Sequence, residues 1–493
     1  MPEVINISLS PQANHLATHF YNTQESYIDY SQSITKSPND PDVHFKPTLS
    51  YDKSSSNYTP RALIWDFKGG FGSLGQFEYY QSANNDQDGN NDEWTGTIEQ
   101  ISSRPKINKS EYQIALDNGQ HLPPLNNDST KYWTDYSRVL FQPNSYNELH
   151  NWEYDPVEFP EGRLSLGQER KFEGYEVGVS EWKEDGKGIE FLENKYRNML
   201  ENCDGLEGLN IISELDSSWG GFSSELLRDI KDDYNPKTTI FTWGNYNGKR
   251  LEQLGNREIL SRIRTFLELQ RNSSIFIPMS TPQSLPSSID PSSLWQTSAL
   301  KSLVFEPFQT LVSQRENRVS LSTIADNLTL GTERRIVSNV EVQFGEENLN
   351  FADTFFIRDR GAPHTFSKST VHKPSRQSSA SDIVELSEKF QKKSSLDDDS
   401  KKRREVDKSH VDYISKIPVS QSSSFPTFLK SSDSLKTSLE ITTRPKKTLQ
   451  EMKTFVSRFV RGDERENMIQ ELEVLAEEYV FGWEDSDGSD DDY

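Results

Sequence analysis

The stretch Asp216-Ser-Ser-Trp-Gly-Gly-Phe-Ser-Ser224 lies between a short apolar run, Leu209–Ile212, and a helix-like run, Glu225–Ile230. A strand, a glycine-containing turn and a helix in this order place backbone N–H groups and a helix N-terminus around a phosphate. Only Gly220 and Gly221 are free to adopt positive φ, and tryptophan and phenylalanine flank them. The stretch therefore has the position of a phosphate loop but little of the glycine that such a loop needs.

Strand-like and helix-like segments alternate on both sides of this stretch. The other strand-like runs are Val4–Ser8, Arg61–Asp66 and Thr238–Trp243, and the helix-like runs are Asn14–Tyr21, Glu184–Met199, Arg257–Leu269 and Leu294–Val312. Such alternation predicts an α/β fold with a largely parallel sheet.

The composition limits the classes of protein to which the chain can belong. Only 32% of its 493 residues are hydrophobic, so we expect much of the chain to lie outside packed cores. The net charge of −23 argues against general affinity for nucleic acids or anionic membranes, which require a basic surface. Cys203 is the only cysteine, which excludes an intrachain disulfide and a cysteine-based zinc site.

Membrane and targeting signals are missing from the sequence pattern. No apolar run approaches the ~18 residues of a membrane-spanning helix. The opening residues include Glu3, and the first lysine and arginine are Lys36 and Arg61, unlike an arginine-rich transit peptide. We therefore expect the protein to face the cytosol and to associate with any organelle from outside or through a partner.

Changes in amino-acid composition divide the chain into segments. Serine and lysine dominate after about residue 367, which is typical of a disordered segment, and an apolar stripe at helical spacing follows near Met468 and Leu472. The expected division is an N-terminal domain over 1–290 with a polar insertion at about 82–128, a central helix and second domain over 291–366, a disordered linker over 367–447, a helical segment over 448–483 and an acidic tail over 484–493.

Several motifs together resemble the tubulin superfamily. Ser10-Pro-Gln-Ala-Asn-His15 follows the first strand, in the place of tubulin's Gly-Gln-Cys-Gly-Asn-Gln loop. Tyr58-Thr-Pro-Arg-Ala-Leu-Ile-Trp-Asp66 is similar to a tubulin strand, Asn151-Trp152 is similar to a later nucleotide loop, and the stretch at 216–224 replaces Gly-Gly-Gly-Thr-Gly-Ser-Gly. The resemblance implies a tubulin/FtsZ-like fold, in which a parallel-sheet domain of the nucleotide-binding type is followed by a second domain and a C-terminal helix.

A second group of motifs resembles one divergent branch, the Misato proteins, called misato-like in fungi. These motifs are Ala13-Asn-His-Leu16, Tyr132-Trp133, Pro160-Glu-Gly-Arg163, Arg360-Gly-Ala-Pro363 and Gly482-Trp483. The resemblance implies a role in mitochondrial inheritance and in partitioning of mitochondrial DNA. It also implies a location at the mitochondrion, peripheral and cytosol-facing, and in the cytoplasm. The expected partners are cytoskeletal or mitochondrial-surface proteins, without direct binding of nucleic acid.

The nucleotide site that the tubulin resemblance implies is degraded here. Pro11 has no N–H to donate, Trp219-Gly-Gly-Phe222 lies over Thr-Gly-Ser-Gly, and the activating Asn-Ala-Asp segment has no convincing counterpart. We therefore favour a vestigial turn that packs Trp219 against the sheet, with no catalytic residues and no certain cofactor, and GTP or GDP remains the alternative. If nucleotide binding is retained, the residues implied are Gln12, Asn14, Asp66, Asn151, Ser218, Gly220 and Gly221. Gln12 and the glycine pair would then face the phosphates, and Asn14 and Asn151 the base or sugar.

Four short motifs resemble functional sites only weakly. Gly70-Phe-Gly-Ser-Leu-Gly75 matches a dinucleotide fingerprint, but no helix-like run follows it. His15 and His19 share one helix face, and we interpret them as surface or half-buried imidazoles, so that no metal site is expected. Lys401–Arg404 is interpreted as a solvated charge run. In the acidic tail, the candidate phosphorylation sites are Ser486 and Ser489.

Three functions from different classes follow from these observations. The favoured one is a non-catalytic tubulin-like protein that supports mitochondrial inheritance through protein contacts. The first alternative is a GTP-binding, polymerising tubulin-like GTPase, against which the poor glycine loop argues. The second alternative is a cofactor in chaperonin or tubulin assembly, which only the likeness to tubulin suggests.

Overall fold

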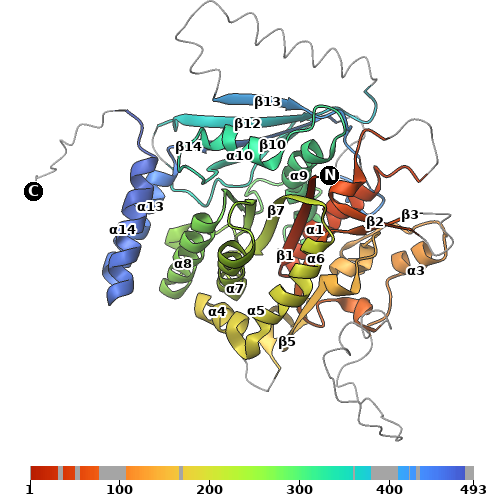
Figure 1. The fold of residues 1–493 in the computed structure, drawn as a ribbon, viewed down its shortest axis with the longest axis horizontal. Coiled ribbons are helices and arrows are strands. Elements are labelled where there is room, and N and C mark those ends of the chain that lie inside the picture. Colours follow the sequence, from red (N-terminus) through yellow and green to blue (C-terminus); the bar gives the residue numbers. More distant parts are fainter. Residues whose placement is uncertain are drawn as a thin grey trace, which may run out of the picture.

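The computed structural model describes residues 2–30, 37–49, 56–76, 107–165, 170–358, 361–378, 409–420, 422–428 and 433–482. The predictions for residues 82–106, for Lys401–Arg404 and for the tail with Ser486 and Ser489 lie outside the described residues. In Figure 1 a larger α/β body carries a smaller sheet above it, and two C-terminal helices lie at its left.

A seven-stranded sheet forms the centre of the larger body. In sheet order its strands are β6 (Phe159–Leu164), β5 (Tyr146–Asp155), β4 (Ala62–Lys68), β1 (Pro2–Leu9), β7 (Gly205–Glu214), β8 (Thr239–Asn245) and β9 (Ile275–Met279). All neighbouring strands are parallel except β6, which runs antiparallel to β5 at one edge. β1 and β4 are almost entirely buried, as expected for strands of a parallel sheet with both faces covered, and the predicted parallel α/β sheet is confirmed.

Helices cover both faces of this sheet. The helix α1 (Pro11–Glu25) follows β1 on the way to β4, whereas α7 (Ser218–Asp229) joins β7 to β8 in the opposite direction along the sheet. Right-handed crossovers therefore place α1 and α7 on opposite faces. α9 (Leu294–Ser313) packs against α1, and both α4 (Tyr175–Lys183) and α8 (Asn256–Asn272) pack against α7 (Figure 1).

Short elements complete the larger body. They are the strand pair β2 (Phe45–Leu49) and β3 (Ser56–Pro60), and the helices α3 (Glu111–Asp117), α5 (Lys187–Glu190), α6 (Arg197–Glu201) and α10 (Leu321–Thr329). The prediction of a surface loop over 82–128 is wrong for its described end, where α3 buries Tyr112 in a small cluster with Tyr136 and Trp295. One buried aromatic residue thus anchors a segment whose overall polarity suggested a loop.

A second sheet contradicts the prediction of a disordered linker over 367–447. Its strands, in sheet order, are β11 (Glu347–Asn350), β10 (Asn339–Phe344), β14 (Leu435–Thr442), β12 (Thr365–Lys373) and β13 (His410–Ile414). In β12 the residues Ser367, Ser369, Val371 and Lys373 alternate toward the interior and are buried. Small hydroxyl side chains therefore fill positions where apolar residues were expected, and the hydroxyl of Ser367 donates to the Leu328 carbonyl.

The C-terminal segment contains two helices, where one was predicted. They are α13 (Pro445–Phe459) and α14 (Asp463–Glu478), and Gly462 between them has φ 86°. The predicted apolar stripe of the last helix is confirmed, since Met468, Leu472 and Ala476 are buried.

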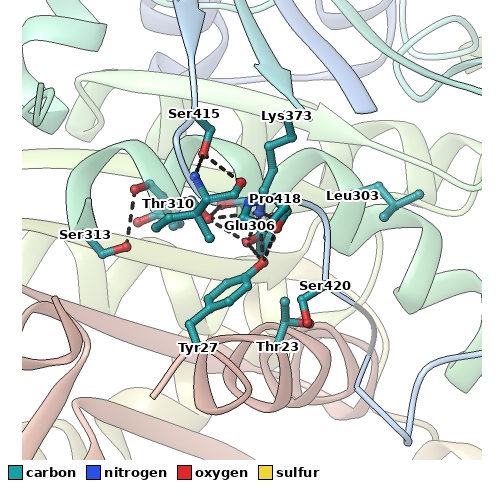
Figure 2. Close-up of polar contacts among 12 residues, drawn as sticks. Thr23, Tyr27, Leu303, Glu306, Thr310, Ser313, Lys373, Ser415, Pro418 and Ser420 are labelled. Atoms are coloured by element: carbon teal, nitrogen blue, oxygen red, sulfur yellow. Dashed lines mark hydrogen bonds and ion pairs between the residues drawn. The ribbon is translucent and has the colours of Figure 1, made fainter. Parts of the chain in front are cut away.

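A buried polar junction joins the two sheets' domains. Figure 2 shows Lys373 of β12 reaching toward Glu306 of α9, with Tyr27, which follows α1, beside them. The ammonium of Lys373 donates to Glu306 Oε2 at 2.7 Å and to the hydroxyl of Tyr27 at 2.9 Å, and that hydroxyl donates to Glu306 Oε1 at 3.0 Å. Both partners of the ion pair are almost fully buried, so α1, α9 and β12 are tied at one point.

Candidate functional site

A cleft of about 830 Å³ runs along the carboxyl edge of the parallel sheet. Ligand sites in open α/β sheets form at this edge, because the loops that follow the parallel strands meet there. Gln12 after β1, Phe67 of β4, Asp216 after β7 and Asn245 at the end of β8 all line the cleft. The sheet therefore retains a cleft where a nucleotide would lie in a fold of this kind.

The structure brings few of the predicted nucleotide residues to this cleft. Of the seven residues named from the sequence, all of them described, only Gln12 lines it. Asn151 lies on β5 with its side-chain amide donating to Glu184 Oε2 at 3.1 Å. Gln12 is thus the one predicted residue placed to contact a ligand there.

Gly220 and Gly221 do not form a turn. Both lie within α7, and neither has positive φ. A Cβ on Gly220 would lie 2.4 Å from the hydroxyl oxygen of Thr265 on α8, and a Cβ on Gly221 would lie 2.0 Å from the carbonyl oxygen of Tyr175 on α4. The glycines are required for close helix packing, so the prediction of a turn with positive φ at this pair is wrong.

The N-terminus of α7 is covered by the chain itself. The backbone N–H of Ser218 donates to the carbonyl of Phe172 at 3.3 Å, and the Trp219 ring lies against Phe67 of β4 and against Phe172. Trp219 therefore packs against the sheet as the sequence predicts. A phosphate at this helix end would have to displace the segment that contains Phe172.

Asn14 and Asp66 bond to each other rather than facing the cleft. The amide of Asn14 donates to Asp66 Oδ2 at 2.8 Å, and the indole N–H of Trp133 donates to the same oxygen at 3.0 Å. Asn14 also accepts a hydrogen bond from the Ser8 hydroxyl at 2.7 Å. Burial raises the pKa of Asp66 to about 7. This network joins β1, α1, β4 and the segment around Trp133.

The first loop preserves a glycine-like backbone without glycine. Ser10 has φ 116°, a region that side chains rarely adopt and that costs about 1–3 kcal/mol. Its hydroxyl caps α1 by accepting from the N–H of Ala13 at 3.2 Å, and Pro11 occupies the first helical position. Ser10 thus has a backbone conformation that glycine favours, and its side chain caps α1.

Three buried polar side chains line the cleft and lack hydrogen-bond partners among the described residues. They are Asn245, with both amide atoms unpaired, Trp219, through its indole N–H, and Ser261 of α8, through its hydroxyl. Sequence reasoning missed Asn245 and Ser261. A polar residue that ends an apolar parallel strand, as Asn245 ends Thr239–Asn245, is the signal that could have found the first.

Carboxylates outnumber basic groups around the cleft. Its lining contains six acidic residues, Glu161, Glu173, Glu214, Asp216, Glu258 and Asp290, against three basic residues, Lys131, Lys249 and Arg257. Burial raises the pKa of Glu214 above its ordinary value. The Arg262 guanidinium donates to Asp216 at 2.6 Å and to the Lys249 carbonyl at 2.9 Å, which fixes one wall.

The structure also shows where the histidine pair and the Gly70 motif lie. His15 and His19 are fully buried, not at the surface or half-buried as expected: His15 Nδ1 lies 2.7 Å from the Tyr136 hydroxyl, and His19 Nε2 lies 2.8 Å from the Trp295 carbonyl. Burial lowers the pKa of both histidines to about 3. Gly70 packs against Asp66, where a Cβ would lie 2.1 Å from Oδ1, and a short 3₁₀ helix (Gly72–Gln76) follows.

Neither a cluster of metal-ligating residues nor a membrane-spanning helix occurs within the described ranges. No group of three or more histidine, cysteine, aspartate or glutamate residues there is arranged to hold a metal ion. None of the helices described is both long enough and apolar enough to cross a bilayer.

Two family models match most of the α/β body. The Misato Segment II tubulin-like domain matches residues 2–118, and a tubulin domain matches residues 122–314. Protein DML1 of Yarrowia lipolytica is 35% identical over the full length of both chains, and Protein DML1 of Kluyveromyces lactis is 30% identical over 99% of both. Protein DML1 of Debaryomyces hansenii is 41% identical over 57% of this chain and 58% of its own length.

Proposed function

The chain belongs to the Misato family of tubulin-like proteins, and from this premise we propose that it is a non-catalytic member that acts through protein contacts in mitochondrial inheritance and in partitioning of mitochondrial DNA. The observation that carries the non-catalytic part is the closed N-terminus of α7. There the Ser218 N–H is bonded to the Phe172 carbonyl, and the Trp219 ring packs beside Phe172.

The electrostatics of the cleft support the same proposal. A nucleoside triphosphate carries several negative charges, and binding it requires N–H groups, cations or a metal ion to offset them. The cleft has a surplus of carboxylates, and both glycines of α7 are held in helix packing. Hydrolysis would require a phosphate position that α7 no longer presents.

The mitochondrial part of the proposal is supported by the family. We place the protein at the cytosolic face of mitochondria and in the cytoplasm, bound to protein partners rather than to DNA. The acidic composition supports this choice of partner, since a net charge of −23 disfavours contact with phosphate backbones.

Extraction of nucleotide from the purified protein tests the non-catalytic part. We expect far less than one guanine nucleotide per chain and no saturable GTP binding at micromolar protein. The variant Gln12→Leu is the matched probe, because Gln12 lines the cleft whereas a bulky residue at Gly220 would disrupt helix packing. Stoichiometric nucleotide that is lost in Gln12→Leu would contradict the proposal and favour a nucleotide-binding tubulin-like protein.

Depletion of the protein in a fungal cell tests the mitochondrial part. We expect uneven mitochondrial inheritance and loss of mitochondrial DNA, and protease treatment of intact mitochondria should degrade the bound protein. Normal inheritance after depletion, or protection from protease, would refute the role or the cytosol-facing location respectively.

A further inference from the structure

Three polar groups at one corner of the cleft are buried without a partner. Asn245 is 1% exposed, and neither its Oδ1 nor its Nδ2 is bonded within the described residues; the same holds for Nε1 of Trp219 and Oγ of Ser261. A buried polar group left unpaired costs about 1–3 kcal/mol. Because all three side chains line the cleft, a ligand there could satisfy them together.

The corner is built from three adjacent elements. Asn245 ends β8, and its carbonyl accepts a hydrogen bond from the N–H of Leu215 at 2.8 Å, which places it next to the end of β7. Trp219 lies in the first turn of α7, and Ser261 lies one turn before Thr265, the residue that packs against Gly220. Strand ends and helix starts fix these groups before any ligand binds.

The unpaired groups match a peptide. An asparagine side chain offers a donor and an acceptor side by side, which pair with the C=O and N–H of a peptide backbone. The indole N–H of Trp219 supplies one further donor, suited to a second carbonyl, and the hydroxyl of Ser261 serves as either. This mixture of donors and acceptors differs from the row of N–H donors that a phosphate requires.

The charge of the cleft lining favours a basic peptide. Six acidic and three basic residues line the cleft, and two further cations pair with the acidic ones, Arg262 with Asp216 and Lys171 with Glu161 and Glu173, so a small negative surplus remains. Aromatic residues also line the cleft, but their rings are buried against other rings, so the carboxylates carry the preference for a basic ligand. These aromatic residues are Phe67, Tyr154, Phe172, Trp219 and Tyr246. The volume of about 830 Å³ lies within the range of about 300–1,000 Å³ that is usual for ligand sites.

We propose that this cleft binds an extended segment of a partner protein that carries lysine and arginine, with Asn245, Trp219 and Ser261 contacting its backbone and the cleft carboxylates contacting its basic side chains. The inference rests on the proposed function, in which the protein acts through protein contacts. It specifies the place of one such contact, in the cleft that tubulin-like folds use for nucleotide.

Fluorescence polarisation with labelled short peptides tests the inference on the full chain. Three peptides of one length carry lysine and arginine, glutamine, or glutamate at the same positions. We expect the basic peptide to bind at least about tenfold more tightly than the glutamine peptide at about 0.15 M salt, and the glutamate peptide not to bind. Equal binding of all three, or binding of none, would overturn the inference.

Two sets of variants locate the binding. Asn245→Leu preserves side-chain size and removes the unpaired amide, so we expect about tenfold weaker binding and a folded protein by circular dichroism. The double variant Glu161→Gln, Glu173→Gln removes two exposed rim charges, which Lys171 bridges, and should weaken binding about three- to tenfold. Glu346→Gln, Glu347→Gln makes the same charge change on exposed residues of the second sheet and should have no effect.

Addition of GTP separates the two proposals. If the basic peptide binds and GTP does not displace it, both proposals stand. If GTP displaces the peptide or binds in its place, the cleft is a nucleotide site, and the proposed function and the inference both fail. If neither ligand binds, or if the rim variant and its control behave alike, only the inference fails.

Discussion

Replacing Gly221 with alanine tests whether the glycine pair of α7 serves helix packing or a phosphate. The new Cβ would lie 2.0 Å from the carbonyl oxygen of Tyr175, which is about 1.4 Å closer than the 3.4 Å at which ordinary contact begins. The obstacle is the backbone of α4, so it can be relieved only by moving that helix. Overpacking of this kind costs about 3 kcal/mol.

The position of Gly221 inside a helix partly offsets this loss of stability. Alanine is favoured over glycine inside a helix by about 1 kcal/mol, so we expect a net destabilisation of about 2 kcal/mol. A chain of this length shifts by about 1 °C per kcal/mol, so the midpoint of thermal unfolding of nucleotide-free protein should fall by about 2 °C. Circular dichroism during heating measures it directly.

Gly361→Ala is the matched control for this substitution. A Cβ at Gly361 meets nothing within 4 Å, and the residue has no positive φ, so the unfolding midpoint should change little. If Gly221→Ala were as stable as the wild type without nucleotide, and lost nucleotide binding instead, the packing argument would be refuted. The glycine pair would then serve a phosphate after all.

Three further outcomes are expected from the structure. Lys373→Met leaves the buried Glu306 carboxylate unpaired and should lower the free energy of unfolding in urea by about 3–5 kcal/mol, most of which Glu306→Leu in the same chain should restore. Burial raises the pKa of Asp66 to about 7, so the folded carboxyl holds a proton that the unfolded chain releases; stability should fall as pH rises from about 4 to 7, and Asp66→Asn should flatten that dependence in urea titrations. Arg264→Ala removes ion pairs with Glu464 and Glu176 and should cost less than about 2 kcal/mol, with a smaller effect at high salt, because the apolar stripe of α14 remains.

The parallel sheet was predictable because its strands are locally encoded. Val4–Ser8 and Arg61–Asp66 are short, mostly apolar runs, and the structure buries them in and beside β1 and β4. The part of the second sheet after residue 366 was missed because β12 and β14 contain serine and lysine among their apolar residues. Lys373 looks like a solvent-exposed residue in the sequence, and only the distant Glu306 and Tyr27 explain its burial.

In the candidate site, too, local sequence predicts some features, whereas others depend on contacts between distant residues. Gln12 was named because its loop resembles the tubulin loop after the first strand, and it does line the cleft beyond β1. Its contact with a nucleotide stays a prediction. Asn14 and Asp66 were assigned to a ligand because their bonds to each other and to Trp133 span more than 50 positions in the chain. No local pattern shows whether a buried polar side chain is already satisfied.

Glycine in a degraded phosphate loop supports two structural interpretations that local sequence does not separate. A glycine can provide positive φ, or it can allow another backbone to approach closely, and Gly221 does the second. The residues that flank the glycine pair separate these two interpretations. Trp219 and Phe222 are too large to surround a phosphate, and both are fully buried in the aromatic core with Trp65 and Phe67. Bulky apolar residues beside the glycines therefore favour helix packing over phosphate binding, and this is why the stretch at 216–224 indicates a tubulin-like fold more strongly than a tubulin-like reaction.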